Sequence, residues 1–104
     1  MNDIHPDEAY KIILDCGATI IDVRTPAEFA DCHIPGARNI NINDSDFVES
    51  IRLLPHDAVY IVNCQTGGRS TRACVIMQKL GLVGAKNLEG GITAWKKLGL
   101  PVER

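Results

Sequence analysis

The sequence predicts an α/β fold in which a mostly parallel sheet carries helices on both faces. Two nearly continuous apolar runs, residues 18–23 and 58–63, are typical of strands that are buried on both sides. Segments with apolar residues at helical spacing precede, separate and follow these runs, and turn signals fall at short intervals. Because strands that alternate with helices usually pair in parallel, this order predicts a sheet built from βα units.

The first helix is expected before the strand at 18–23. Its apolar residues recur at helical spacing and form one stripe: Ala9, Ile12, Ile13 and Cys16. Gly17 follows where a helix C-cap is expected. The stripe predicts that Cys16 packs in the core.

A second helix is expected over residues 25–32, where the start signals are unusually complete. Thr25 is the expected N-cap and Pro26 takes the first helical position. Glu28 is placed to reach back to the N-cap, as in a capping box.

The remaining elements continue the alternation of strand and helix. They are a short strand over 37–42, a helix over 47–54, a helix around 73–80, a last strand running into a turn over 85–91, and a final helix over 92–99. In a sheet of this kind, ligands bind at the carboxyl ends of the strands. The run at 58–63 ends at Cys64, so this cysteine lies at such an end.

Length and composition indicate one globular domain over residues 1–104, with 45% hydrophobic and 23% charged residues. The 11 basic and 13 acidic residues leave a formal charge of −2 and no basic stripe of the kind that nucleic acid requires. No secretion signal and no apolar run of membrane-spanning length is present. The sequence therefore predicts a cytoplasmic protein with no nucleic-acid or membrane partner.

The cysteines are expected to be free thiols, because they form no CxxC pair and no zinc-finger spacing with the histidines. No metal or other cofactor is expected. Cys32 and Cys74 are both candidates to resolve an oxidised Cys64, although packing is the favoured role for each. No histidine is paired with Cys64 in the sequence, so none is expected to be catalytic.

The loop that follows the strand at 58–63 has the composition of an anion cradle. A cysteine reacts as its thiolate, and the pKa of a free thiol is about 8.5. Gly67 and Gly68 adopt positive φ without penalty, which allows consecutive N–H groups to turn inward. The N-terminus of the next helix also favours a negative charge. The loop is therefore expected to hold Cys64 as an anionic sulfur.

Two arginines near the start of that helix indicate an anionic substrate or intermediate. Arg69 and Arg72 lie where the helix macrodipole disfavours a cation by roughly 0.3–1 kcal/mol. An anion bound at the loop would offset this cost.

Three stretches of the chain, in this order, resemble the single-domain rhodaneses, a family of sulfurtransferases: IIDVRTPAEFADCHIPGARNI, VNCQTGGRS and NLEGGITAWKKLGLP. The resemblance covers roughly residues 4–102. It implies a five-stranded parallel sheet flanked by helices on both faces. It also implies a six-residue active loop that runs from Cys64 to Arg69.

The resemblance implies that Cys64 accepts a sulfane sulfur from thiosulfate or a similar donor as a persulfide and passes it on. Cys64 and Arg69 are then the catalytic residues, and Arg69 attracts the donor. The substrate-binding residues implied are Gln65, Thr66, Gly67, Gly68, Arg69 and Ser70. Asp22 and Arg24 would support the loop, and we expect Arg24 to pair with Glu28. The acceptor is left open between cyanide, a thioredoxin-like dithiol and another acceptor protein.

The loop departs from one habit of the family, because relatives that process thiosulfate often carry a basic residue just after the cysteine. Gln65 and Thr66 are neutral, so a protein persulfide or another small donor is an alternative to thiosulfate. Two other functions are weighed. A cysteine-dependent phosphatase or arsenate reductase usually has five residues between cysteine and arginine, whereas four separate Cys64 from Arg69. A non-enzymatic interaction module commonly lacks the cysteine.

Overall fold

The computed structural model describes residues 2–104, and its five strands form one sheet. The strands are β1 (Asp3–Ile4), β2 (Thr19–Asp22), β3 (Arg38–Asn39), β4 (Tyr60–Asn63) and β5 (Ala85–Leu88). Their order in the sheet is β1-β5-β4-β2-β3, and every neighbouring pair is parallel. The prediction of a five-stranded parallel sheet is confirmed.

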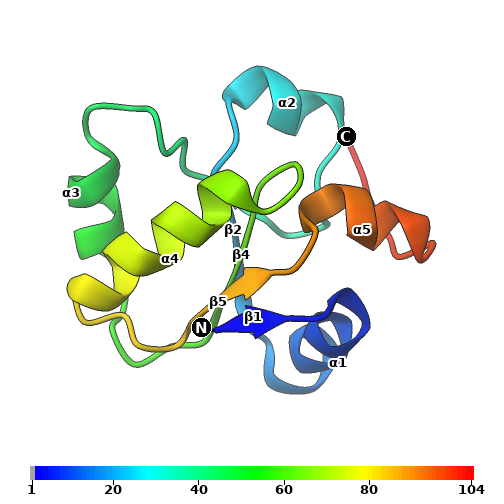
Figure 1. Ribbon diagram of the computed structural model, residues 1–104, viewed down its shortest axis with the longest axis horizontal. Coiled ribbons are helices and arrows are strands. Elements are labelled where there is room, and N and C mark those ends of the chain that lie inside the picture. Colours follow the sequence, from blue (N-terminus) through cyan, green and yellow to red (C-terminus); the bar gives the residue numbers. More distant parts are fainter. Residues whose placement is uncertain (1) are drawn as a thin grey trace.

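Helices cover both faces of the sheet, as expected. They are α1 (Pro6–Cys16), α2 (Pro26–Asp31), α3 (Phe47–Arg52), α4 (Gly68–Lys79) and α5 (Gly91–Lys97). Helices α3 and α4 pack on one face, and α1 and α5 pack on the other (Figure 1). Helix α2 lies beyond the carboxyl ends of the strands, near the start of α4.

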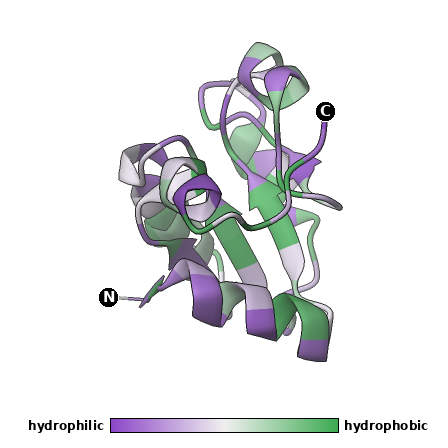
Figure 2. Cartoon of the chain, turned by 90° about the vertical axis from the view of Figure 1, so that its right-hand side faces the viewer, coloured by the Kyte–Doolittle hydropathy of each residue, from purple (hydrophilic) through white to green (hydrophobic). Residues whose placement is uncertain are grey.

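The central strands are buried on both sides because their side chains alternate between two hydrophobic clusters. On β4, Tyr60 and Val62 pack under α3 and α4, whereas Ile61 packs under α1 and α5. Ile21 and Ile20 of β2 divide in the same way. Figure 2 shows the resulting hydrophobic stretch along the strands, between the two helix layers.

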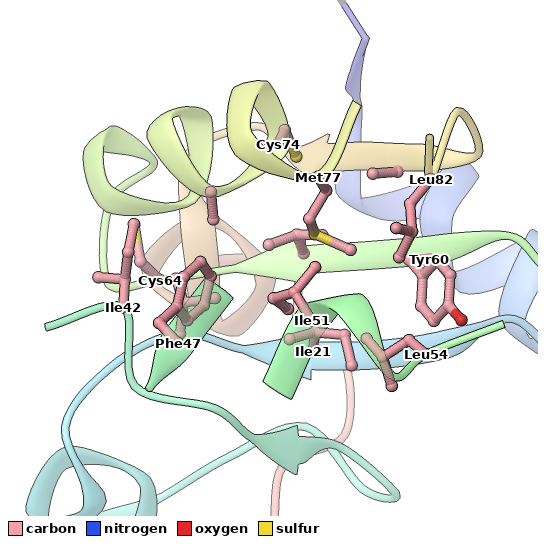
Figure 3. Close-up of a cluster of buried hydrophobic side chains, with 14 residues drawn as sticks. Ile21, Ile42, Phe47, Ile51, Leu54, Tyr60, Cys64, Cys74, Met77 and Leu82 are labelled. Atoms are coloured by element: carbon pink, nitrogen blue, oxygen red, sulfur yellow. The ribbon is translucent and has the colours of Figure 1, made fainter. Parts of the chain in front are cut away.

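The cluster under α3 and α4 ends at the reactive loop, the segment of residues 64–69 in which the sequence predicts a reactive cysteine. Figure 3 shows it extending from Tyr60 and Leu82 at one end to Ile42, Phe47 and Cys64 at the other. The cysteine is therefore the last core residue along β4 and the first residue of the loop.

Strand β1 was not expected from the sequence, because two residues are too few to show an alternating pattern. It pairs with β5, with Asp3 opposite Asn87 and Ile4 opposite Leu88. This edge strand therefore brings a carboxylate beside β5.

The prediction that Cys16 packs in the core is wrong. Helix α1 buries Pro6 and Ala9, which lie in its first turns, whereas Cys16 is its last residue and is exposed. Gly17, with φ of 65°, ends the helix directly afterwards. The apolar stripe thus runs past the part of the helix that contacts the sheet. Within residues 2–104, no helix is long and apolar enough to cross a membrane.

Candidate active site

The candidate active site lies at the carboxyl ends of β2 and β4, where parallel strands place their following loops side by side. Asp22 ends β2, and Cys64 follows the last residue of β4. Helix α4 begins at Gly68, only four residues after the cysteine. A strand, a tight loop and a helix N-terminus therefore meet at the Cys64 sulfur.

The loop turns hydrogen-bond donors toward this sulfur. The Gly67 N–H donates to Cys64 Sγ at 3.0 Å, and the Ser70 hydroxyl oxygen lies 3.3 Å from the same atom. Gly67 has φ of 116°, which a residue with a side chain rarely adopts. The structure thus shows the expected inward N–H group at Gly67. Gly68 does not share the positive φ, because it is the first residue of α4.

Two opposing effects set the pKa of the Cys64 thiol. The side chain is only 1% exposed, and this burial raises the pKa because it disfavours the charged form. Hydrogen bonds outweigh the burial and lower the pKa below its ordinary value. Their donors are the Ser70 hydroxyl and the backbone N–H groups of Ser70, Gly67 and Thr66. The hydrogen bonds therefore stabilise the thiolate form of Cys64 although the side chain is buried.

Helix α5 holds two carbonyl groups of the loop away from the Cys64 sulfur. The N–H of Ile92 donates to the Cys64 carbonyl at 3.0 Å, and the N–H of Thr93 donates to the Gln65 carbonyl at 3.1 Å. These N–H groups belong to the first turn of α5 and have no partner within that helix. Because two loop carbonyls are fixed outward, the loop N–H groups are available to the sulfur.

Gly91 makes this contact between the loop and α5 possible. A Cβ at this position would lie 2.5 Å from the Gln65 carbonyl oxygen and 2.6 Å from that of Cys64. Its φ of +62° also disfavours any other residue. Sequence reasoning did not give this glycine a role, although the pair Gly90-Gly91 in the turn that follows the last strand was a visible signal.

Asp22 and Arg24 form a buried ion pair that supports the loop from β2. The Arg24 guanidinium donates to both carboxylate oxygens of Asp22, at 2.8–3.1 Å, and the two side chains are 0% and 3% exposed. Arg24 also donates to the Gln65 side-chain oxygen at 3.2 Å and to the Cys32 carbonyl at 2.6 Å. One arginine thereby links β2, the reactive loop and the end of α2.

The expected pairing of Arg24 with Glu28 is wrong, because Glu28 pairs with Arg69. Arg69 Nη1 and Nη2 donate to the two Glu28 carboxylate oxygens at 2.8 and 3.0 Å. The Arg69 guanidinium lowers the pKa of Glu28 to about 2, against the opposing effect of burial. Glu28 also closes the predicted capping box with Thr25. The bidentate pair ties the reactive loop to the start of α2.

The other residues singled out in the sequence lie at different depths. Thr66 is exposed on the loop, Gly68 is exposed at the start of α4, and Arg72 is exposed one turn further along α4. Cys74 is buried in the same cluster as Cys64, and burial raises its pKa to about 12. Cys32 is partly buried at the end of α2. Cys74 therefore has the packing role that the sequence favoured for it.

No group of three or more metal-ligating side chains occurs within residues 2–104. The cysteines Cys16, Cys32, Cys64 and Cys74 are all free.

Fold and loop together define a rhodanese-like domain, and the chain belongs to that family, whose model matches residues 5–98. A protein of Arabidopsis thaliana named thiosulfate sulfurtransferase 16, chloroplastic, is 36% identical over 105 residues, covering 91% of this chain and 87% of that protein. A sulfurtransferase of Allochromatium vinosum is also 36% identical, over 98% of this chain and 94% of its own length. The crystal structure of a rhodanese-related protein from Thermoplasma volcanium superimposes with a TM-score of 0.88 at 34% identity, covering 99% of this chain and 98% of that one.

Proposed function

We propose that this protein is a sulfurtransferase that moves a sulfane sulfur from thiosulfate or a similar donor to a thiophilic acceptor, through a persulfide on Cys64. The observation that carries the proposal is the sulfur of Cys64 within reach of the Gly67 N–H, 3.0 Å away, in a loop that lowers its pKa. The sulfurtransferases among the relatives support the same chemistry.

In the first half-reaction, the Cys64 thiolate attacks the outer sulfur of thiosulfate. A bond forms between Sγ and that sulfur, the sulfur–sulfur bond of thiosulfate breaks, and sulfite leaves with the electron pair. The persulfide is anionic, so the same N–H groups that favour the thiolate favour the product. The lowered pKa increases the thiolate fraction of Cys64, so the proposal assigns no general base.

In the second half-reaction, the acceptor attacks the outer sulfur of the persulfide. With cyanide as acceptor, thiocyanate leaves and the Cys64 thiolate is restored. A thiol of a small molecule or of a thioredoxin-like protein would accept the sulfur in the same way and leave as a persulfide. The sequence leaves the acceptor open between these candidates, and the mechanism is compatible with each of them. A cytoplasmic location is part of the same proposal.

The position of Cys64 favours a donor that presents one sulfur atom. The side chain is 1% exposed, so a reacting group has to reach a recessed sulfur. The terminal sulfur of thiosulfate or of a persulfide projects as a single atom, whereas a phosphoryl group carries three oxygen atoms around the reacting centre. The small loop is thus better suited to sulfur transfer than to phosphate hydrolysis.

The contacts of Arg69 also argue against the phosphatase alternative. Two of its guanidinium nitrogens donate to Glu28, so they are not free to bind phosphoryl oxygens over the loop. In a sulfurtransferase, the same pair would hold the loop while the backbone N–H groups bind the sulfur. We therefore propose that Arg69 acts chiefly by fixing the loop, and that its remaining positive field attracts the donor.

The proposal is tested by the intact mass of the reduced protein after incubation with thiosulfate. Wild type is expected to gain one sulfur atom, and cyanide should remove it and release thiocyanate. Cys64→Ser should gain nothing. Cys16→Ser removes an exposed thiol far along the sheet from the loop and should behave as wild type. A gain that persists in Cys64→Ser, or an unmodified wild type that hydrolyses an aryl phosphate, would overturn the proposal.

A further inference from the structure

The Ser70 hydroxyl lies between three acceptors but carries one proton. Its oxygen is 2.5 Å from Asn87 Oδ1, 3.3 Å from Cys64 Sγ and 3.3 Å from the Gly67 carbonyl oxygen. The Gly67 carbonyl already accepts hydrogen bonds from the N–H and the hydroxyl of Thr71. The effective choice for the proton of Ser70 is therefore between Asn87 and Cys64.

The orientation of the Asn87 amide is set from the edge of the sheet. Its Nδ2 donates to the Asp3 carboxylate at 3.0 Å, so its Oδ1 must be the atom that faces Ser70. Asp3 and Asn87 are opposite residues of the parallel pair β1 and β5. The short edge strand thus directs an acceptor of β5 toward the reactive loop.

A buried acceptor that loses its donor carries a free-energy cost. Asn87 is 6% exposed and Ser70 is 0% exposed, so water does not readily replace a lost hydrogen bond at either residue. Within residues 2–104, Ser70 is the donor found for Asn87 Oδ1. Turning the hydroxyl toward Cys64 consequently leaves the Asn87 carbonyl without that donor.

We propose that Asn87 and the Cys64 sulfur compete for the single hydroxyl proton of Ser70, which makes Asn87 a positioning residue for the nucleophile. This inference rests on the role of Cys64 as the nucleophile proposed above. In the thiol state, Cys64 S–H donates to the Ser70 oxygen and Ser70 donates to Asn87, so all three groups are paired. In the thiolate state, the hydroxyl turns to the sulfur and Asn87 loses its donor.

The change of hydrogen-bond partner leaves the hydroxyl proton on Ser70. When Cys64 ionises, its own proton passes to solvent and the hydroxyl only rotates about its carbon–oxygen bond. Once Cys64 carries a persulfide, the negative charge lies mainly on the outer sulfur, and the hydroxyl can return to Asn87. The free-energy cost of the unpaired Asn87 carbonyl is therefore present in the thiolate state and absent in the persulfide state. This difference favours conversion of the thiolate to the persulfide.

Charged groups lie near the site, and a test has to leave them unchanged. Arg69 on α4 couples electrostatically with Cys64 and with Asp22 on β2, and the two charged residues are held in ion pairs, Arg69 with Glu28 and Asp22 with Arg24. Asp3 on β1 is the charged group on the side of β5. Substitution of Asn87 alone alters none of these charges.

The first test is the pH dependence of alkylation at Cys64, measured by peptide mass without any sulfur donor. Asn87→Leu keeps the branched shape of the side chain and removes the acceptor, so it should lower the pKa of Cys64 and increase the alkylation rate severalfold at pH values below that pKa. Ser70→Ala should raise the pKa. Adding Asn87→Leu to Ser70→Ala should then change nothing, because no hydroxyl remains to be released. An unchanged or raised pKa in Asn87→Leu, or an equal shift in both backgrounds, would overturn the proposal.

A second measurement is made on the wild-type chain, so that its main outcome does not depend on how a variant folds. The chemical shift of the Asn87 side-chain carbonyl carbon should follow the ionisation of Cys64, because that carbonyl loses its hydrogen bond when the thiolate forms. In Ser70→Ala, the chemical shift of this carbon should not change as Cys64 ionises. A shift that is constant through the titration in wild type would refute the competition while leaving persulfide formation intact. A missing persulfide with a shift that does follow the titration would refute the proposed function instead.

Discussion

Gly91→Ala is the substitution that most sharply tests how the loop is built. The added Cβ would lie 2.5 Å from the Gln65 carbonyl oxygen and 2.6 Å from the Cys64 carbonyl oxygen, so the loop or α5 has to move. Moving apart weakens two hydrogen bonds, from Ile92 and Thr93, which are worth about 0.5–1.5 kcal/mol each. The left-handed backbone of residue 91 adds about 1–2 kcal/mol of strain.

Gly17→Ala provides a matched control for the strain alone. Gly17 has φ of +65°, close to the +62° of Gly91, but a Cβ there would meet nothing within 4 Å. The strain should lower the free energy of unfolding of both variants by a similar amount. In Gly91→Ala, the free energy of unfolding should fall by about 1–3 kcal/mol more than in Gly17→Ala, because two hydrogen bonds are also weakened. Denaturant unfolding measures this difference, and the alkylation rate of Cys64 reports the loop. Equal destabilisation of the two variants, with normal Cys64 reactivity in Gly91→Ala, would refute the view that α5 holds the loop carbonyls.

Two further predictions concern the ion pairs beside the loop. Arg24→Ala leaves the buried Asp22 carboxylate without its ion-pair partner and should lower the free energy of unfolding by about 3–5 kcal/mol. The control Arg72→Ala changes an exposed residue of α4 and should lower it by less than about 0.5 kcal/mol. Similar Tm values for the two variants would contradict this prediction. Glu28 has its pKa lowered from 4.5 to about 2 in the folded chain, chiefly by Arg69, so its contribution to stability is present above the unfolded pKa and is lost as the pH falls toward the folded one. The stability advantage of wild type over Glu28→Gln should therefore shrink across that interval in a series of unfolding curves, and an advantage that does not depend on pH would exclude the ionised pair as its source.

The sequence predicted the elements whose signals are local. The apolar run at 58–63 indicated a strand buried on both sides, and it became β4 because its side chains alternate between the two clusters. The start of α2 was equally clear, because Thr25, Pro26 and Glu28 interact within one turn. Gly67 was predictable as well, since only the local backbone has to turn an N–H group toward the sulfur.

Contacts between distant segments were not predictable from one sequence. Glu28 lies four residues after Arg24, which suggested a local pair, yet Arg69 is brought to it from 41 residues away. Arg24 instead pairs with Asp22, two residues before it. Spacing along the chain cannot show which arginine pairs with Glu28 when one of the two, Arg69, comes close only in the folded structure.

The same limit explains the residues that sequence reasoning missed. Gly91 acquires its role only because α5 starts against the loop of β4, and Asn87 only because β5 lies between β1 and β4. Strand β1 itself is two residues long and gives no periodic signal. Gly91 contacts the loop through α5, and the proposed effect of Asn87 on Cys64 likewise depends on a strand from another part of the chain.

The central claim is that Cys64 carries the transferred sulfur as a covalent intermediate, and a single-turnover measurement tests it most directly. The reduced protein is incubated with thiosulfate, freed from all small molecules, and then mixed with cyanide. The account predicts that the isolated protein releases one equivalent of thiocyanate per chain and returns to its original mass, and that Cys64→Ser releases none. Thiocyanate that forms only while thiosulfate is still present would contradict a Cys64 persulfide, because the sulfur would then pass directly from donor to acceptor.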